Sequence, residues 1–338
     1  MINQTLPIPA FFDPLKVDKI WQVPYQERAI QAREWAKQNN IRPAASDSPK
    51  VCFVGIDIQN TFCMKSGELF VGGRSGVGAI EDNVRLCRYL YENMCNLTQI
   101  TMSLDTHRAI AIFHETFWIN DEYEHPQAGI TIISANDIKT GVWKVNPAIA
   151  GIFGGNYIGL QRYALDYLEN LEQNGKYALL IWPFHAMLGG VGHALVSSVE
   201  EAVFTHSIVR NAMTDFQIKG GNPLSEEYGL GGAEVRNAVN KAQKNTEFLN
   251  LLLNFDMVII TGQASSHCVK SSIENLLEDV MAQDPSLAKK AYILRDCSSP
   301  VVIPGVIDFT DQAEEAFAKF SDAGMNLITT QTPIYELV

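Results

Sequence analysis

The chain has 338 residues, of which 46% are hydrophobic and 19% charged, a balance typical of a soluble protein with a sizeable core. Its net charge of −12 argues against a nucleic-acid partner, because a protein that follows a phosphate backbone needs a basic face. No run of about 18 apolar residues would span a membrane, and residues 1–16 lack the pattern of a secretory signal. The six cysteines show no disulfide or CxxC spacing, so we expect a reducing, cytoplasmic location.

Residues 1–48 are polar and interrupted by prolines, which indicates an N-terminal extension with one helix near 25–39 and a linker. From residue 49 to 338, apolar runs alternate with helical periodicity. This alternation predicts an α/β fold of three layers, in which helices cover both faces of a mostly parallel sheet. The predicted strands are 51–57, 100–104, 177–181, 257–261 and 291–294, and the predicted helices are 78–97, 232–253, 266–283 and 310–322. In such sheets, functional residues gather at the carboxyl ends of the strands.

Several polar residues follow the predicted strands directly. Asp57 ends the first strand, although a single carboxylate there is more often a cap or turn residue. Asp105 and His107 end the next strand, and an extended backbone directs side chains two residues apart to the same side. His114 follows seven residues later, and His185 comes after a further strand. Imidazole and carboxylate groups together suit zinc, iron or manganese; the alternative is a solvated turn with chance histidines.

Cys268 gives the sharpest signal in the chain. It lies in GQASSHCV at 262–269, which joins a predicted strand to the start of a helix. The dipole and free N–H groups of a first helical turn stabilise a thiolate or an oxyanion, although a small residue packing a helix start fits equally well. Lys219 ends a short apolar stretch. It would favour the thiolate if it faces the same cleft, whereas a lysine in such a place is usually a surface residue.

Taken together, these segments resemble the nicotinamidases, within the isochorismatase-like cysteine hydrolases of Rossmann-like fold. The resemblance covers about 51–115 and 180–330, and its motifs follow one another in the family order. The motifs are DIQNTFC at 57–63, DTH at 105–107 with His114, WPFH at 182–185, IKG at 218–220 and GQASSHCV at 262–269.

The resemblance implies a hydrolase of linear amide C–N bonds that converts nicotinamide to nicotinic acid and ammonia in NAD salvage. Cys268 would form a thioester with the substrate, and Asp57 would act as general base and then proton donor. Lys219 would stabilise the thiolate and orient Asp57. The backbone N–H groups of Ala264 and Cys268 would form the oxyanion hole, and the peptide bond between Gln263 and Ala264 would be cis.

The resemblance also implies one divalent metal ion, zinc or alternatively iron or manganese, that binds the pyridine nitrogen of the substrate. Its ligands would be Asp105, His107, His114 and His185. Phe62 and Trp182 would stack on the ring, and Gln263 would contact the substrate. We expect a small-molecule amide as the ligand, no nucleic-acid or membrane partner, and a homo-oligomer.

The chain departs from the family between His114 and Trp182, where an insertion of about 116–178 interrupts the domain. Part of it, at 161–173, predicts an amphipathic helix. A lid, an oligomer contact and a wall of the pocket are all compatible with this segment. Each of these roles would alter the choice of substrate.

Three other functions remain open from the sequence. A cysteine amidohydrolase acting on a ureido or carbamoyl compound would keep the thiol chemistry. A catalytically silent binding or scaffold protein would keep the fold, but Asp57, Lys219 and Cys268 are all present, which disfavours it. A hydrolase that uses metal-activated water would employ the histidines and leave Cys268 idle.

Overall fold

A six-stranded parallel sheet forms the centre of the computed structural model, which describes residues 4–305 and 307–337. The strand order is β12-β9-β8-β1-β2-β7, and every neighbouring pair is parallel. The strands are β1 (Val51–Ile56), β2 (Gln99–Asp105), β7 (Asp215–Lys219), β8 (Met257–Gly262), β9 (Ala291–Leu294) and β12 (Asn326–Ile328). The predicted α/β class is therefore confirmed.

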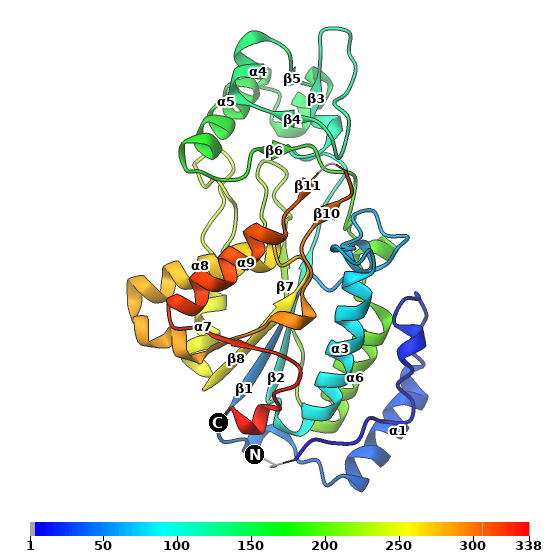
Figure 1. Cartoon of the computed structure of the whole chain (residues 1–338). Helices are drawn as coiled ribbons and strands as arrows, with labels where there is room; N and C mark the ends of the chain where they lie inside the picture. Colours follow the sequence, from blue (N-terminus) through cyan, green and yellow to red (C-terminus); the bar gives the residue numbers. More distant parts are fainter. Residues whose placement is uncertain (1–3, 306, 338) are drawn as a thin grey trace.

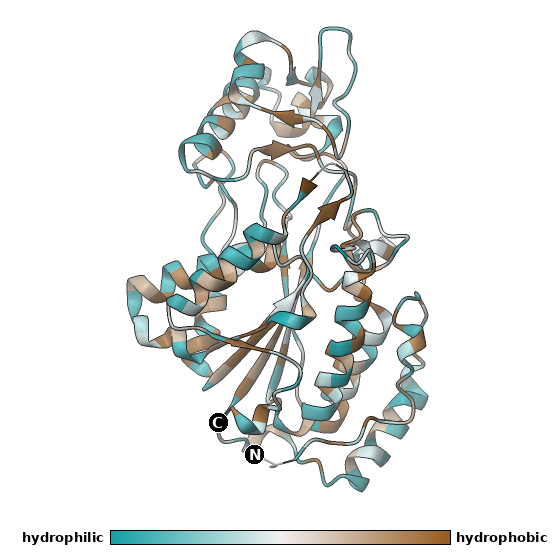
Figure 2. Cartoon of the chain, in the orientation of Figure 1, coloured by the Kyte–Doolittle hydropathy of each residue, from teal (hydrophilic) through white to brown (hydrophobic). Residues whose placement is uncertain are grey.

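Helices cover both faces of this sheet (Figure 1). One face carries α3 (Gly78–Asn93) and α6 (Ser197–Arg210), and the other carries α7 (Glu247–Asn254), α8 (Cys268–Gln283) and α9 (Thr310–Asp322). The side chains of β1 alternate between the two resulting hydrophobic clusters: Val51 and Phe53 join the cluster with α3 and α6, and Cys52, Val54 and Ile56 join the other. Figure 2 shows the apolar strands enclosed between helices with polar outer faces. A strand buried on both faces needs a continuous apolar run, which is what β1 has.

The N-terminal segment packs against the main body. Its helix α1 (Tyr25–Gln38) contacts α6, and Leu6, Phe12 and Trp35 are buried in the same cluster as β1. The predicted helix near 25–39 is thus confirmed. Short 3₁₀ helices lie at Pro14–Lys16, Ala44–Ser46, Met94–Asn96, Glu115–Phe117, Pro147–Phe153, Val191–His193, Pro285–Lys290, Arg295–Cys297 and Ile334–Glu336.

Residues 116–178 lie above the carboxyl end of the sheet (Figure 1). Trp118, Tyr167 and Leu168 of this segment belong to a third hydrophobic cluster, which also includes Ile112 and Ile181 outside it. Its elements are β3 (Trp118–Ile119), β4 (Ile132–Ile133), α4 (Ala135–Thr140), β5 (Lys144–Val145) and α5 (Tyr157–Gln173), joined by β6 (Leu179–Leu180) just after the insertion. The predicted helix at 161–173 is part of α5. The short helix α2 (Asn60–Cys63) and the hairpin of β10 (Val302–Ile303) and β11 (Ile307–Asp308) lie closer to the sheet.

Two predicted elements are wrong in part. The helix predicted at 232–253 is reduced to α7, because the side chain of Asn240 bonds the backbone of Val235 and Ala242 in place of helical hydrogen bonds. The strand predicted at 177–181 is only β6, and it pairs antiparallel with β4 outside the central sheet. The central sheet instead contains β7, an unpredicted edge strand whose exposed Phe216 and Ile218 obscure its pattern. Helix α6 and strand β12 were not predicted.

No helix within the described residues has the length and apolarity needed to cross a membrane.

We expect Gly262→Ala to lower the free energy of unfolding by about 3 kcal/mol or more. Gly262 ends β8 with a φ of 139°, and a Cβ there would overlap with the backbone of Ile56 in β1. Chemical denaturation measures the effect. The control is Gly151→Ala, because Gly151 has an ordinary φ and a Cβ added there would meet no atom within 4 Å. Equal stability of the two variants would contradict the close approach of β8 to β1.

Candidate active site

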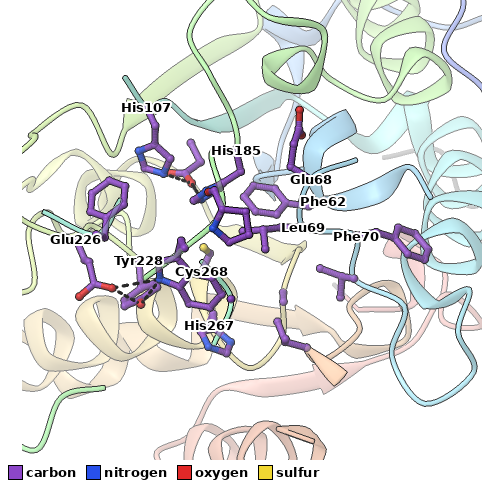
Figure 3. A pocket seen from close by; sticks show the side chains of 18 of the residues that line it. Phe62, Glu68, Leu69, Phe70, His107, His185, Glu226, Tyr228, His267 and Cys268 are labelled. Atoms are coloured by element: carbon purple, nitrogen blue, oxygen red, sulfur yellow. Dashed lines mark hydrogen bonds and ion pairs between the residues drawn. The ribbon is translucent and has the colours of Figure 1, made fainter. Parts of the chain in front are cut away.

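One cavity lies between the carboxyl ends of the central strands and the insertion. It has a volume of about 380 Å³. Its wall includes Cys268 and Lys219 from the sheet side and Gly129 from the insertion. Figure 3 shows Cys268, His107 and His185 directed toward the same space.

Lys219 brings together the three residues that the sequence suggested for thiol chemistry. Its Nζ atom lies 2.8 Å from Asp57 Oδ2 and 3.7 Å from Cys268 Sγ. The three side chains come from the ends of β7 and β1 and from the start of α8, and none is more than 8% exposed. Lys219 Nζ is also 3.0 Å from Asp105 Oδ1, so this ammonium group links the thiol to the histidine cluster.

Burial governs the protonation of this group of side chains. Burial raises the pKa of the Cys268 thiol well above its usual value, while Lys219 acts in the opposite direction. Burial likewise raises the pKa of Asp57 despite the ion pair with Lys219, which makes this carboxylate a stronger base than an exposed aspartate. For Lys219, burial acts to lower the pKa, but the ion pairs with Asp105 and Asp57 outweigh it and hold the amine charged. The arrangement therefore suits proton transfer from the thiol to Asp57 beside a fixed cation.

Two polar residues that the sequence did not reveal hold the carboxylates in place. Ser103 Oγ donates to Asp57 Oδ1 at 2.5 Å and accepts from the Asp57 backbone N–H at 3.0 Å. Gln59 donates to the carbonyl oxygen of Asp105 and accepts from its N–H, both at 2.8 Å. Both residues lie in or beside predicted strand ends, but only the pairing of β1 with β2 brings them to their partners.

The loop before α8 presents backbone N–H groups beside the thiol. Cys268 is the first residue of α8, where a helix leaves N–H groups without an intrahelical partner, and Ala264 also lines the cavity. The peptide bond between Gln263 and Ala264 is cis, as predicted. The side chain of Gln263, however, turns away from the cavity, where it donates to Asp82 Oδ2 at 2.8 Å and accepts from the N–H of Ser299 at 3.3 Å. This geometry leaves its side chain no contact with a ligand in the cavity.

Three of the four predicted metal ligands lie close together. The ligand atoms of Asp105, His107 and His185 all lie within 4.8 Å of one another, and all three residues are buried. Asp105 Oδ2 lies 2.8 Å from His107 Nε2 and 3.6 Å from His185 Nε2. The ring of His114 is adjacent, with its centroid 5.9 Å from that of His107 and 6.0 Å from that of His185.

The hydrogen bonds of the histidines orient them as metal ligands. In each ring, Nδ1 faces a backbone carbonyl: that of Gly220 for His107, of Pro183 for His185 and of Arg108 for His114. Because a carbonyl only accepts, Nδ1 carries a proton in each ring, and Nε2 of a neutral His185 or His114 keeps its lone pair. In His107, burial acts to lower the pKa, but Asp105, 2.8 Å from Nε2, outweighs it and raises the pKa, so this Nε2 donates to Asp105 and would give up its proton to a metal ion. Nε2 of His114 is buried without a hydrogen-bond partner among the described residues. Burial also lowers the pKa of His114 to about 3, which keeps it neutral. These residues therefore fit a divalent transition metal.

Gly220 allows the histidine cluster and Lys219 to meet. It follows Lys219 with a φ of 76°, and a Cβ would overlap with Asp105 Oδ1 and lie 2.6 Å from His107 Cε1. A side chain at this position would separate the two halves of the site.

The remaining wall is aromatic and acidic. Phe62 and Trp182, the predicted ring-binding residues, both line the cavity. Glu226, Tyr228 and His267 line it as well, and the sequence did not single them out. Only His267 carried a local signal, as the neighbour of Cys268; Glu226 and Tyr228 come from an irregular segment without a recognisable motif.

We expect Ser103→Ala to lower the free energy of unfolding by about 1–3 kcal/mol, because the substitution leaves a buried carboxylate oxygen and a buried N–H of Asp57 without their partner. Denaturant unfolding measures the change. Ser321→Ala is the matched control, since Ser321 is an exposed serine of α9. A Ser103→Ala protein as stable as this control would show that Ser103 does not hold Asp57.

Solved structures share this fold, whereas no protein-family model and no curated protein sequence matches the chain. The yeast nicotinamidase bound to the inhibitor nicotinaldehyde is 16% identical, with 82% of this chain and 99% of that chain covered and a TM-score of 0.51. A second structure of the yeast enzyme gives the same identity and coverage and a TM-score of 0.50. A nicotinamidase/pyrazinamidase of Acinetobacter baumanii is 13% identical over 85% of this chain and 99% of that chain, with a TM-score of 0.47. The chain therefore shares the α/β fold of the yeast nicotinamidase.

Proposed function

We propose that this protein is a cysteine-dependent amidohydrolase and that nicotinamide is its substrate. The observation that carries this proposal is the contact of Lys219 Nζ with both Asp57 and Cys268 inside a cavity. A thiol, a buried carboxylate and a buried ammonium group in mutual contact form the set that covalent amide hydrolysis requires. The fold shared with the yeast nicotinamidase is consistent with this assignment.

In the proposed reaction, Asp57 removes the proton from Cys268 as Sγ attacks the amide carbonyl carbon. Lys219 holds Asp57 in place and stabilises the thiolate, and the N–H groups of Ala264 and Cys268 stabilise the oxyanion. Asp57 then returns its proton to the leaving nitrogen, so that ammonia departs and a thioester remains. Water opens the thioester with Asp57 as the base, which gives the carboxylic acid and the free thiol.

The metal site belongs to the same proposal. Asp105, His107 and His185 would hold the ion, with His114 beside them as the fourth ligand. When bound, the metal supplies a Lewis acid that orients the substrate through its pyridine nitrogen. We propose zinc, since a site of neutral imidazoles and one carboxylate suits it, with iron and manganese as alternatives.

Phe62 and Trp182 would provide the faces that hold the pyridine ring, because both line the cavity beside His185. A different small amide, such as a ureido or carbamoyl compound, is the second candidate. It is favoured by one observation: Gly129 of the insertion contributes to the cavity wall, so the insertion shapes the pocket.

We expect purified protein to release ammonia from nicotinamide, and Cys268→Ala to lower kcat by about 10³-fold or more, because the covalent step is lost. A coupled ammonia assay measures both. Cys95→Ala is the control, a buried cysteine outside the cavity wall, and it keeps activity within about twofold. Activity that survives in Cys268→Ala would favour metal-activated water, and a wild-type protein inactive on every small amide would favour a binding protein.

We expect the purified protein to contain about one divalent metal ion per chain, and His107→Ala to lose it, since each ligand contributes a large share of the affinity. Elemental analysis by mass spectrometry gives the metal content, and a chelated sample re-supplied with zinc tests the link to activity. His125→Ala is the control, because His125 is exposed and bonds only backbone carbonyls. Full metal content in His107→Ala would refute this ligand assignment.

A further inference from the structure

Three aromatic rings form a corner in the cavity wall beside Cys268. The rings of Trp182 and Tyr228 have centroids 6.5 Å apart and planes inclined by 78°. The ring of His267 lies 5.9 Å from Trp182 at 85° and 5.8 Å from Tyr228 at 63°. All three residues line the cavity, and Figure 3 shows Tyr228 and His267 grouped near Cys268. We call these three rings the aromatic corner.

Glu226 stands behind the aromatic corner and bonds two of its rings. Its Oε1 accepts from Tyr228 Oη at 2.5 Å and from Trp182 Nε1 at 3.3 Å (Figure 3), and its Oε2 accepts from Tyr167 Oη at 3.2 Å. Only 3% of Glu226 is exposed, yet it contributes to the cavity wall. A carboxylate that accepts from both a phenol and an indole increases the negative potential at the faces of these rings.

The cavity wall also carries more negative than positive charge, which would attract a cation. Among the described residues that line it, the carboxylates are those of Glu68, Asp105, Glu226 and Glu227. Lys219 is the one lysine or arginine among them, and its charge is matched by Asp57 and Asp105. His267 adds no positive charge, because burial lowers its pKa to about 4. With a divalent metal ion bound at the histidine cluster, the four carboxylates of the wall and Asp57 exceed the charges of Lys219 and the ion by two when Glu226 is ionised.

We propose that the aromatic corner binds a cationic group, an ammonium or trimethylammonium, carried by the amide substrate. Cations are attracted to the faces of aromatic rings, and Glu226 in its ionised form adds a negative charge behind two of the rings. Burial raises the pKa of Glu226 to about 7, and a cation in the corner would favour its ionised form. The cavity of about 380 Å³ is in the size range of ligands larger than a single-ring amide.

This inference rests on the proposed amidohydrolase function and deepens it. A carboxamide held at Cys268, with its ring next to Phe62, leaves Tyr228 and one side of His267 for a substituent. The other face of His267 stacks on Tyr177, with ring centroids 5.0 Å apart. The substrate class is then an aromatic carboxamide with a cationic arm, of which nicotinamide represents only the core.

The test uses two aromatic carboxamides of equal shape, (3-carbamoylphenyl)trimethylammonium and 3-tert-butylbenzamide, which differ in one positive charge. Isothermal titration calorimetry with the metal-loaded Cys268→Ala protein measures binding without turnover. We expect the cation to bind about tenfold more tightly than its neutral counterpart. Glu226→Gln in the same background should reduce this ratio to about two, with its melting temperature recorded to confirm folding.

Glu68→Gln is the matched control, because Glu68 is a second carboxylate of the cavity wall that bonds Thr61 and none of the three rings. It should keep most of the charge preference. Equal affinities of the two amides for the Cys268→Ala protein would overturn the aromatic corner as a cation site. An equal loss of preference in Glu68→Gln and Glu226→Gln would also overturn it, in favour of a general effect of cavity charge.

Ammonia release from nicotinamide and from both test amides, measured with the wild-type protein, keeps this test separate from the proposed function. A charge preference in binding without hydrolysis of any amide would overturn the amidohydrolase assignment and leave the cation site standing. Hydrolysis of an amide without a charge preference in binding would support the amidohydrolase assignment and overturn the cation site.

Discussion

The buried ammonium group of Lys219 is the interaction on which the site depends. It touches Asp57, Asp105 and Cys268 at once, and therefore joins the Cys268 thiol to the histidine cluster. Burying three such charges is costly unless each is paired, and here each carboxylate has further donors, Ser103 for Asp57 and His107 for Asp105. Lys219 is placed at the end of the edge strand β7, so the register between β2 and β7 decides whether these groups meet.

The same parallel sheet explains why chemistry gathers at one place. Parallel strands end at a common edge, and β1, β2, β7 and β8 each deliver a reactive or supporting group there. Close approach is needed for these groups to touch. Gly262 allows β8 to lie close to β1, and Gly220 allows the chain after Lys219 to lie close to His107. The site therefore requires glycine at these two positions as well as its charged residues.

Parts of the chain outside the strand ends form much of the cavity wall. The insertion provides Gly129 and the helix α5, whose Tyr167 bonds Glu226, and the irregular segment before α7 provides Glu226 and Tyr228. These residues add an acidic and aromatic wall to a cavity whose floor carries the thiol. Proteins that share this fold can therefore bind different ligands, because the aromatic and acidic wall comes from other segments than the strand ends that carry the thiol.

The hydrophobic pattern of adjacent residues in the sequence was enough to predict several of the buried strands and amphipathic helices. The continuous apolar run at 51–56 predicted a buried strand, and the helical periodicity predicted α3 and α9. The motifs around Asp57, Asp105 and Cys268 indicated side chains that the structure places near one another. Tertiary structure alone decided the rest. The edge strand β7 has a mixed pattern because one face is exposed, and the segment at 232–246 is held by side-chain bonds that outweigh helix formation. The side-chain orientations of Gln263, Ser103 and Glu226 depend on hydrogen bonds to Asp82, Asp57 and Tyr167, respectively. These partners are distant in the sequence, so the local sequence does not predict the orientations.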